Sequence, residues 1–332
     1  MVPVTTPGPA VTTPRDRRSD GGAGRPDSPP RDRADRLRRL ATLASVGVAT
    51  TLVVAKLLTW FATGSVSLLS SLIDSAIDAF ASIVTFVGVR HAMRPADVAH
   101  RFGHGKAEPL AAFLQAAFIA GSALILASEA LSRLIEPRPI DNTGVGIAVM
   151  AFAIALTGGL VLFQRFVIRR TGSLAISADS VHYAGDLLIN LAVIAALALT
   201  EATGAWFVDP LFALGIVLFL LCSAAGVGRS ALDVLMDREL SEEDRARIKR
   251  IVLAHPRTRG LHDLRTRSTG ADTFIELHLE LDGDLSLDDA HAITDQVERQ
   301  LMRAFPGAEV MLHQEPAGIE DERLDERLVR QG

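Results

Sequence analysis

Four ionisable residues in two apolar stretches of this chain are spaced for metal chemistry. Asp74 and Asp78 stand four residues apart in one stretch, and His182 and Asp186 stand four apart in the other. Side chains at positions i and i+4 lie on one face of a helix, so each pair points two potential ligands at one place. If the two helices face each other, the four side chains predict a site for a divalent metal ion.

Charge is costly in such apolar segments. One Asp at the centre of a membrane-spanning helix costs roughly 2.5 to 3.5 kcal/mol, so three of them need compensation. A bound Zn²⁺ would supply it, because zinc accepts carboxylate oxygen and imidazole nitrogen as ligands. The same donor set suits Cd²⁺ and Fe²⁺, so the metal stays open. The other interpretation is a buried polar network, protonated in part, that joins helices without a ligand.

Two further groups of possible ligands lie outside these stretches. The first is a short series in a polar connection, Asp97, His100 and His104. The second is spread through the C-terminal region and consists of His262, His278, His291, His313 and Glu315. Either group can bind metal, but histidines in loops and small domains are often ordinary surface residues, and spacing alone leaves both interpretations open.

Composition places the chain among membrane proteins. Of its 332 residues, 48% are hydrophobic, the mean hydropathy is +0.27, and most of the apolar residues lie between positions 41 and 230. The formal net charge of -5 argues against nucleic acid as a partner. Cys222 is the only cysteine, which excludes a disulfide framework and a thiolate zinc site. Any metal must therefore be held by His, Asp or Glu.

The apolar residues form six runs, each long enough for a helix that crosses a bilayer, which takes roughly 20 residues. We expect these helices at residues 41–61, 66–89, 110–131, 144–163, 174–199 and 207–227. Arginine and lysine gather in the N-terminal tail, in alternate connections and after the last run. Basic segments stay on the cytoplasmic side, so both termini are predicted to be cytoplasmic.

After the last run the pattern changes to that of a small α+β domain. Ser241 followed by acidic residues predicts the start of a helix. Strict alternation over Ile275–Leu281 predicts a half-buried strand with a short strand ahead of it. A second helix is expected from Ser286 and a last strand at 310–313. The order helix, strand, strand, helix, strand predicts an open, ferredoxin-like or metallochaperone-like sheet with helices on one face.

Several segments together resemble the cation diffusion facilitator family, and in particular its bacterial zinc and ferrous-iron efflux pumps. They are Gly64-Ser-Val-Ser-Leu, Asp74-Ser-Ala-Ile-Asp78, Phe102-Gly-His-Gly-Lys-Ala-Glu108, Gln164-Arg-Phe-Val-Ile-Arg-Arg170, His182-Tyr-Ala-Gly-Asp186 and His262-Asp-Leu-Arg-Thr-Arg267. The resemblance runs from about Leu40 to Pro316. It implies a homodimeric cation/proton antiporter of the bacterial inner membrane, which exports a divalent cation by alternating access.

The resemblance also implies roles for residues. It makes the four intramembrane residues Asp74, Asp78, His182 and Asp186 the transport site. It makes Asp97, His100 and His104 a loop metal site, and the four C-terminal histidines a binuclear zinc site that stabilises the dimer. The family has Asp where this chain has Glu315, which puts the geometry of that last site in question. Lys106 and Asp237 resemble a family ion pair that joins the membrane and soluble parts.

The expected organisation is a disordered cytoplasmic tail at 1–36, a six-helix transmembrane domain at 37–235, a cytoplasmic metal-binding and dimerisation domain at 236–317 and a flexible tail at 318–332. Two other functions are possible. A membrane-bound metal sensor would use the same sites without transport. An intramembrane metalloenzyme fits less well, because four protein ligands leave no open position for water and no general base stands beside them.

Overall fold

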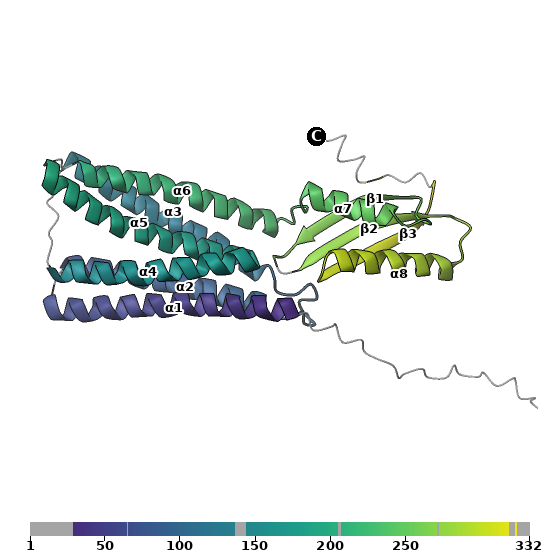
Figure 1. Ribbon diagram of the computed structural model, residues 1–332, viewed down its shortest axis with the longest axis horizontal. Helices are drawn as coiled ribbons and strands as arrows, with labels where there is room; N and C mark the ends of the chain where they lie inside the picture. The colour runs from purple at the N-terminus through teal and green to yellow at the C-terminus, as the bar shows by residue number, and fades with distance from the viewer. Residues whose placement is uncertain are drawn as a thin grey trace, which may run out of the picture.

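The computed structural model describes residues 29–64, 66–136, 144–204, 207–270, 272–318 and Arg323. Six long helices form a bundle, and a smaller domain with two helices and a three-stranded sheet follows at one end of it (Figure 1). The bundle helices are α1 (Pro29–Thr63), α2 (Val66–Ala92), α3 (Ala107–Ile135), α4 (Gly144–Thr171), α5 (Leu174–Thr203) and α6 (Val208–Leu235). All six are long and apolar enough to cross a membrane, which confirms the expected spans.

The first helix begins earlier than the sequence predicts. We expected disorder up to residue 36, but α1 is helical from Pro29, and a proline is tolerated in a first helical turn. Arg38 anchors this end of α1 to the bundle, because its guanidinium donates to the carbonyl of Thr171 at 3.1 Å and lies 3.8 Å from Glu108 Oε2. The charged part of α1 is therefore held by α3 and α4. The rest of the predicted tail lies outside the described residues.

Small residues set the close approach of neighbouring helices. In the bundle, α3 packs along α6, α1 contacts α2 and α4, and α2 and α5 meet directly. Gly88 of α2 faces α3 so closely that a Cβ atom there would lie 2.4 Å from Cβ of Ala111. Close backbone approach at small residues is the usual way in which helices associate within a bilayer.

A tight connection sets the start of α5. Gly172 has φ +63°, a conformation that favours glycine, and Ser173 then caps α5 by accepting a hydrogen bond from the N–H of Ile176. Because α4 and α5 are joined this tightly, they run antiparallel and pack against each other. This fixes the position along the bundle at which the polar residues of α5 face the other helices.

The small domain has the predicted order of elements: α7 (Glu242–Leu253), β1 (Gly260–Ser268), β2 (Thr273–Leu281), α8 (Leu287–Ala304) and β3 (Ala308–Pro316). The central strand β2 pairs antiparallel with β1 and parallel with β3. Alternate residues of β2, such as Ile275 and Leu279, share one buried cluster with α7 and α8. Both helices therefore cover the same face of the sheet, as expected, and the polar residues of β2 lie on the other face.

The connection between α2 and α3 contacts this small domain. The ring of Phe102 lies 5.7 Å from that of Phe274, and the guanidinium of Arg267 stands over both rings. A Cβ atom at Gly105 would lie 2.4 Å from Oγ1 of Thr269, so only glycine fits against this turn. The α2–α3 connection thus packs directly against the small domain.

The helix packing yields a test at glycine. We expect Gly88→Ala to destabilise the bundle by about 1 to 3 kcal/mol, because the added methyl group overlaps Ala111. Gly121→Ala in α3 is the matched control: nothing lies within 4 Å of its Cβ position, and alanine favours a helix. Thermal unfolding of the purified variants should show a lower midpoint only for Gly88→Ala, and equal midpoints for both would contradict the close contact.

Candidate metal centres

Three of the four predicted intramembrane ligands converge in the bundle. Asp78 comes from α2, and His182 and Asp186 come from successive turns of α5. The Nε2 atom of His182 lies 3.0 Å from Oδ1 of Asp78 and 3.8 Å from Oδ2 of Asp186. One ligand atom of each residue lies within 4.8 Å of the other two, which is a spacing that one metal ion can bridge. The imidazole is buried, whereas both carboxylates are partly accessible.

Asp74, the fourth predicted ligand, is not part of this group. It lies one turn before Asp78 on α2 and is exposed in the single chain. Lys56 of α1 reaches the same part of α2, where its ammonium group donates to Oγ of Ser75 at 2.6 Å and to the carbonyl of Ser71 at 3.2 Å. Spacing on a helix predicts which face Asp74 shares, but not whether its carboxylate reaches the other ligands.

A second buried polar group lies on the same helices and was not predicted. Gln164 of α4 donates from Nε2 to Oδ2 of Asp179 at 2.7 Å and to Oγ of Ser45 at 3.0 Å. Ser82 of α2 lies 3.4 Å from Oδ1 of Asp179 and 2.7 Å from the hydroxyl of Tyr183. All five side chains are buried. In the sequence this network appears only as one residue, Asp179, one turn before the pair of His182 and Asp186. Only its contacts in the structure show that it joins four helices.

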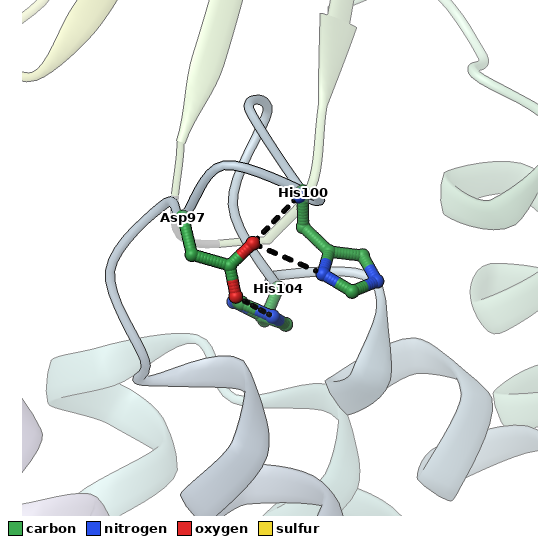
Figure 2. A group of neighbouring side chains, drawn as sticks. All are labelled: Asp97, His100 and His104. Carbon is green, nitrogen blue, oxygen red and sulfur yellow. Dashed lines mark hydrogen bonds and ion pairs between the residues drawn. The ribbon is translucent and has the colours of Figure 1, made fainter.

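The predicted loop ligands also converge (Figure 2). Oδ1 of Asp97 accepts hydrogen bonds from the N–H groups of His100 and Ala99, and Oδ2 lies 3.4 Å from Nε2 of His104. The hydrogen bond from the backbone of His100 lowers the pKa of Asp97, so this carboxylate is kept in its ligand form. The ring of His91, at the end of α2, stacks edge-on against His104 and adds an imidazole that was not predicted.

The third group forms a row across the small sheet. The strand register places His262, His278 and His313 side by side on β1, β2 and β3, with neighbouring rings 5.0 and 4.9 Å apart. Glu315 reaches all three imidazoles: Oε2 lies 3.2 Å from His262, and Oε1 lies 2.6 Å from His278 and 3.5 Å from His313. The register of the three strands brings these residues together, and the sequence alone did not predict that register.

The donor atoms of this row fit a bound cation. Nδ1 of His278 is buried and lies 2.6 Å from Oε1 of Glu315. Imidazole nitrogen and carboxylate oxygen both bind divalent cations when they are deprotonated, so the types of donor in this row suit a metal ion. Glu280, which was not predicted, lies 2.9 Å from the other ring nitrogen of His262, a contact that orients a metal-binding imidazole.

His291 lies apart from this row. It stands on α8, its side chain is 69% exposed, and its nearest charged partner is Asp295 at 3.8 Å. Since α8 covers the opposite face of the sheet, His291 does not reach the row within one chain.

Lys106 and Asp237 are in contact, as the resemblance implies. The ammonium nitrogen lies 2.9 Å from Oδ1 of Asp237, and it also donates to the carbonyl of Leu235 at 3.3 Å. Arg267 of β1 lies 3.7 Å from the same carboxylate. The pair therefore connects the start of α3, the end of α6 and the small domain.

Comparison with known proteins gives the family. The family model of the cation efflux transmembrane domain matches residues 42–236, and that of the cation efflux protein cytoplasmic domain matches residues 240–317. The chain is 48% identical to the cation-efflux pump FieF of Shewanella oneidensis over 282 residues, which cover 85% of this chain and 95% of that protein. It is 44% identical to the FieF pump of Klebsiella pneumoniae over 288 residues, or 86% and 94% of the two chains.

A solved structure resembles the small domain. It is the metal-bound C-terminal domain of the CzcD transporter from Thermotoga maritima, with 27% sequence identity and a TM-score of 0.23, and the match covers 25% of this chain and all of that one. The two family models together span both parts of the fold described above. The chain therefore belongs to the cation efflux family, as a multi-pass membrane protein of a family of transporters rather than of enzymes.

Proposed function

We propose that this protein exports a divalent metal cation from the bacterial cytoplasm across the inner membrane, in exchange for protons. Zn²⁺ is the foremost substrate, and Cd²⁺ and Fe²⁺ are further candidates, because the donor set of carboxylates and imidazole suits all three. The observation that carries the proposal is the convergence of Asp78, His182 and Asp186 between α2 and α5. Identity of 44% and 48% to cation-efflux pumps supports it.

Both the energetic cost of carboxylates in a membrane and their ligand chemistry favour binding of a transported cation at this site. Carboxylates among membrane-spanning helices are expensive unless a positive charge compensates them. Asp74 lies one turn from the group on the same helix, and we propose that it completes the ligand set when α2 and α5 shift between inward- and outward-open states. A site made by two helices, rather than one, can be assembled and opened by such a shift.

Protons and metal would compete for the same atoms. A metal ion needs the lone pair on Nε2 of His182, and a proton on that nitrogen excludes it. In the structure this nitrogen lies against Asp78 and near Asp186, so the carboxylates are placed to share the proton when metal is absent. Protonation from the outer side would release the cation there, and inward proton movement would then drive export.

The distribution of basic residues supports a cytoplasmic location for both termini. Arg90 lies in the last turn of α2 and Arg94 follows that helix, and Arg165, Arg169 and Arg170 lie in the last turns of α4, all at the end of the bundle that adjoins the small domain. Positive residues favour the cytoplasmic side of a membrane. We therefore place the small domain, the loop ligands and the N-terminal segment in the cytoplasm.

The small domain would act as a metal-responsive dimerisation unit. Its family model is named for dimerisation, and the histidine row lies on the sheet face that α7 and α8 leave uncovered. Zinc bound by this row and by the loop group would favour one arrangement of two chains. His291 stays a predicted ligand, and since it cannot reach its own row, we propose that a second chain supplies it.

Of the two competing functions, the metalloenzyme is disfavoured because the chain belongs to a family of transporters. A sensor without transport would need the same ligands, so only a measurement of metal flux across the membrane distinguishes a sensor from a pump.

Transport should depend on the converging ligands. In inverted membrane vesicles, Asp78→Asn and His182→Ala should reduce zinc uptake to the level of vesicles without the protein, because each change removes a ligand. Asp233→Asn is the matched control, since that carboxylate pairs with Arg238 at the end of α6, outside the group. Undiminished zinc uptake by either ligand variant would refute the assignment, and loss of uptake in the control would show that the assay is not site-specific.

Proton exchange can be tested in proteoliposomes that hold a pH-sensitive dye. Zinc entry should raise the internal pH as protons leave, and an acidic lumen should speed zinc entry. An ionophore that dissipates the pH gradient should remove the stimulation. Zinc entry without proton movement would contradict the antiport, and bound zinc without flux would support the sensor instead.

Glu315 should matter for zinc binding at the histidine row. In a background carrying His182→Ala and His100→Ala, Glu315→Gln should weaken zinc binding by roughly tenfold or more, because it removes the carboxylate that three imidazoles share. Glu309→Gln, the same change on β3 at an exposed position, is the control. Isothermal titration calorimetry of the purified protein measures the zinc affinity of both variants, and equal affinities would exclude Glu315 as a ligand.

A further inference from the structure

A groove between α1 and α2 lies near the end of the bundle that adjoins the small domain. It has a volume of about 220 Å³ and is lined by Arg39, Thr42, Leu43, Phe86, Arg90 and Met93. Its two arginines come from different helices, and its remaining side chains are largely apolar. The groove is separate from the converging ligands, since Asp78 lies two turns before Phe86 on α2.

The two arginines carry uncompensated charge. Neither Arg39 nor Arg90 forms an ion pair within the described part of the chain, and both are exposed. Arg38, the neighbour of Arg39, behaves differently because it points inward, where Asp35 and Glu108 each lie 3.8 Å from it. Asp35 and Glu108 thus pair with Arg38, and no acidic residue in the described part of the chain pairs with the two arginines of the groove. The guanidinium of Arg90 stands 5.9 Å from the ring centre of Phe86 and is steered towards the groove by this contact.

The apolar side of the groove continues onto the surface of the spans. Leu43 is 54% exposed, and Val87, next to Phe86 on α2, is 56% exposed. Both lie within helical segments that are long and apolar enough to cross a membrane. A molecule that fits here must offer a negative charge to the arginines and an apolar body to the helix surfaces below them.

We propose that this groove binds an anionic phospholipid, with its phosphate between Arg39 and Arg90 and an acyl chain along Leu43 and Phe86. A phosphate diester is a strong acceptor for arginine, and basic pockets between spanning helices are suited to acidic lipid headgroups. A zwitterionic lipid brings its own positive charge to the same place and is disfavoured. A free cytosolic anion gains nothing from the apolar surface. The bound lipid bridges α1 and α2, so it stabilises their packing.

Native mass spectrometry of the delipidated, full-length protein tests the proposal. The probes are phosphatidylglycerol and phosphatidylcholine, each titrated into the detergent-solubilised protein. We expect phosphatidylglycerol to bind more tightly and to raise the thermal unfolding midpoint. The double variant Arg39→Gln with Arg90→Gln should weaken phosphatidylglycerol binding roughly tenfold or more, since each arginine near an anionic lipid contributes about 1 kcal/mol.

The matched control is Arg165→Gln with Arg169→Gln on α4. These arginines are exposed at the same end of the bundle, so the control removes the same charge without touching the groove. Equal retention of both lipids, equal losses in the two double variants, or displacement of phosphatidylglycerol by inorganic phosphate would each overturn the proposal. A change from dimer to monomer in the groove variant alone would also overturn it, because a second chain would then be the occupant.

Discussion

An ionisable group between lipid-facing helices is costly unless it meets a partner inside the protein, and this constraint orders the bundle. Little water is available there to solvate an unpaired charge, so a contact with a neighbouring helix is strongly favoured. Asp78 meets His182 across α2 and α5, and Lys56 of α1 reaches Ser75 of α2. Apolar packing alone is weakly selective in a membrane, because lipid tails are as apolar as the side chains they would replace. The polar contacts therefore decide which helices are neighbours.

The ligand group depends on a support that contains no ligand. Asp179 lies one turn before His182, and Gln164 and Ser82 bind it from α4 and α2. This network fixes the rotation of α5, which in turn aims the imidazole at Asp78. The candidate ligand His182 lies on α5, and the Asp179 network connects α5 to three other helices. This arrangement suits a site that opens alternately to the two sides of a membrane, because the helices can move as units while the imidazole keeps its orientation.

The junction between the two parts of the chain is built from a different set of interactions. Aromatic and cation–π contacts of Phe102, Phe274 and Arg267 lie next to the ion pair of Lys106 with Asp237. The loop group that contains Asp97 lies in the same connection. Metal bound in this loop would thus act where the membrane helices and the small domain meet, which gives a short physical route between metal sensing and helix movement.

The residues themselves determined much of this protein. Runs of apolar residues predicted the six spans, the alternation in β2 predicted its two faces, and the i, i+4 pairs predicted four candidate ligands, three of which converge. These features follow from hydrophobic periodicity and helical spacing, which are local properties. The extra turns at the start of α1 were missed because that stretch is polar and carries no apolar periodicity, and the contacts that anchor this end of α1, from Arg38 to Glu108 and Thr171, join distant parts of the chain.

Only the tertiary structure decided which predicted ligands meet. Strand register aligned His262, His278 and His313 and left His291 on another layer, and helix packing brought Asp78 of α2 to the α5 pair but left Asp74 outside the group. The Asp179 network and the groove between α1 and α2 could not be predicted either, since each depends on how side chains from different helices pack together. Spacing along one element fixes a side chain's direction, whereas the distance between two elements depends on how all of them pack.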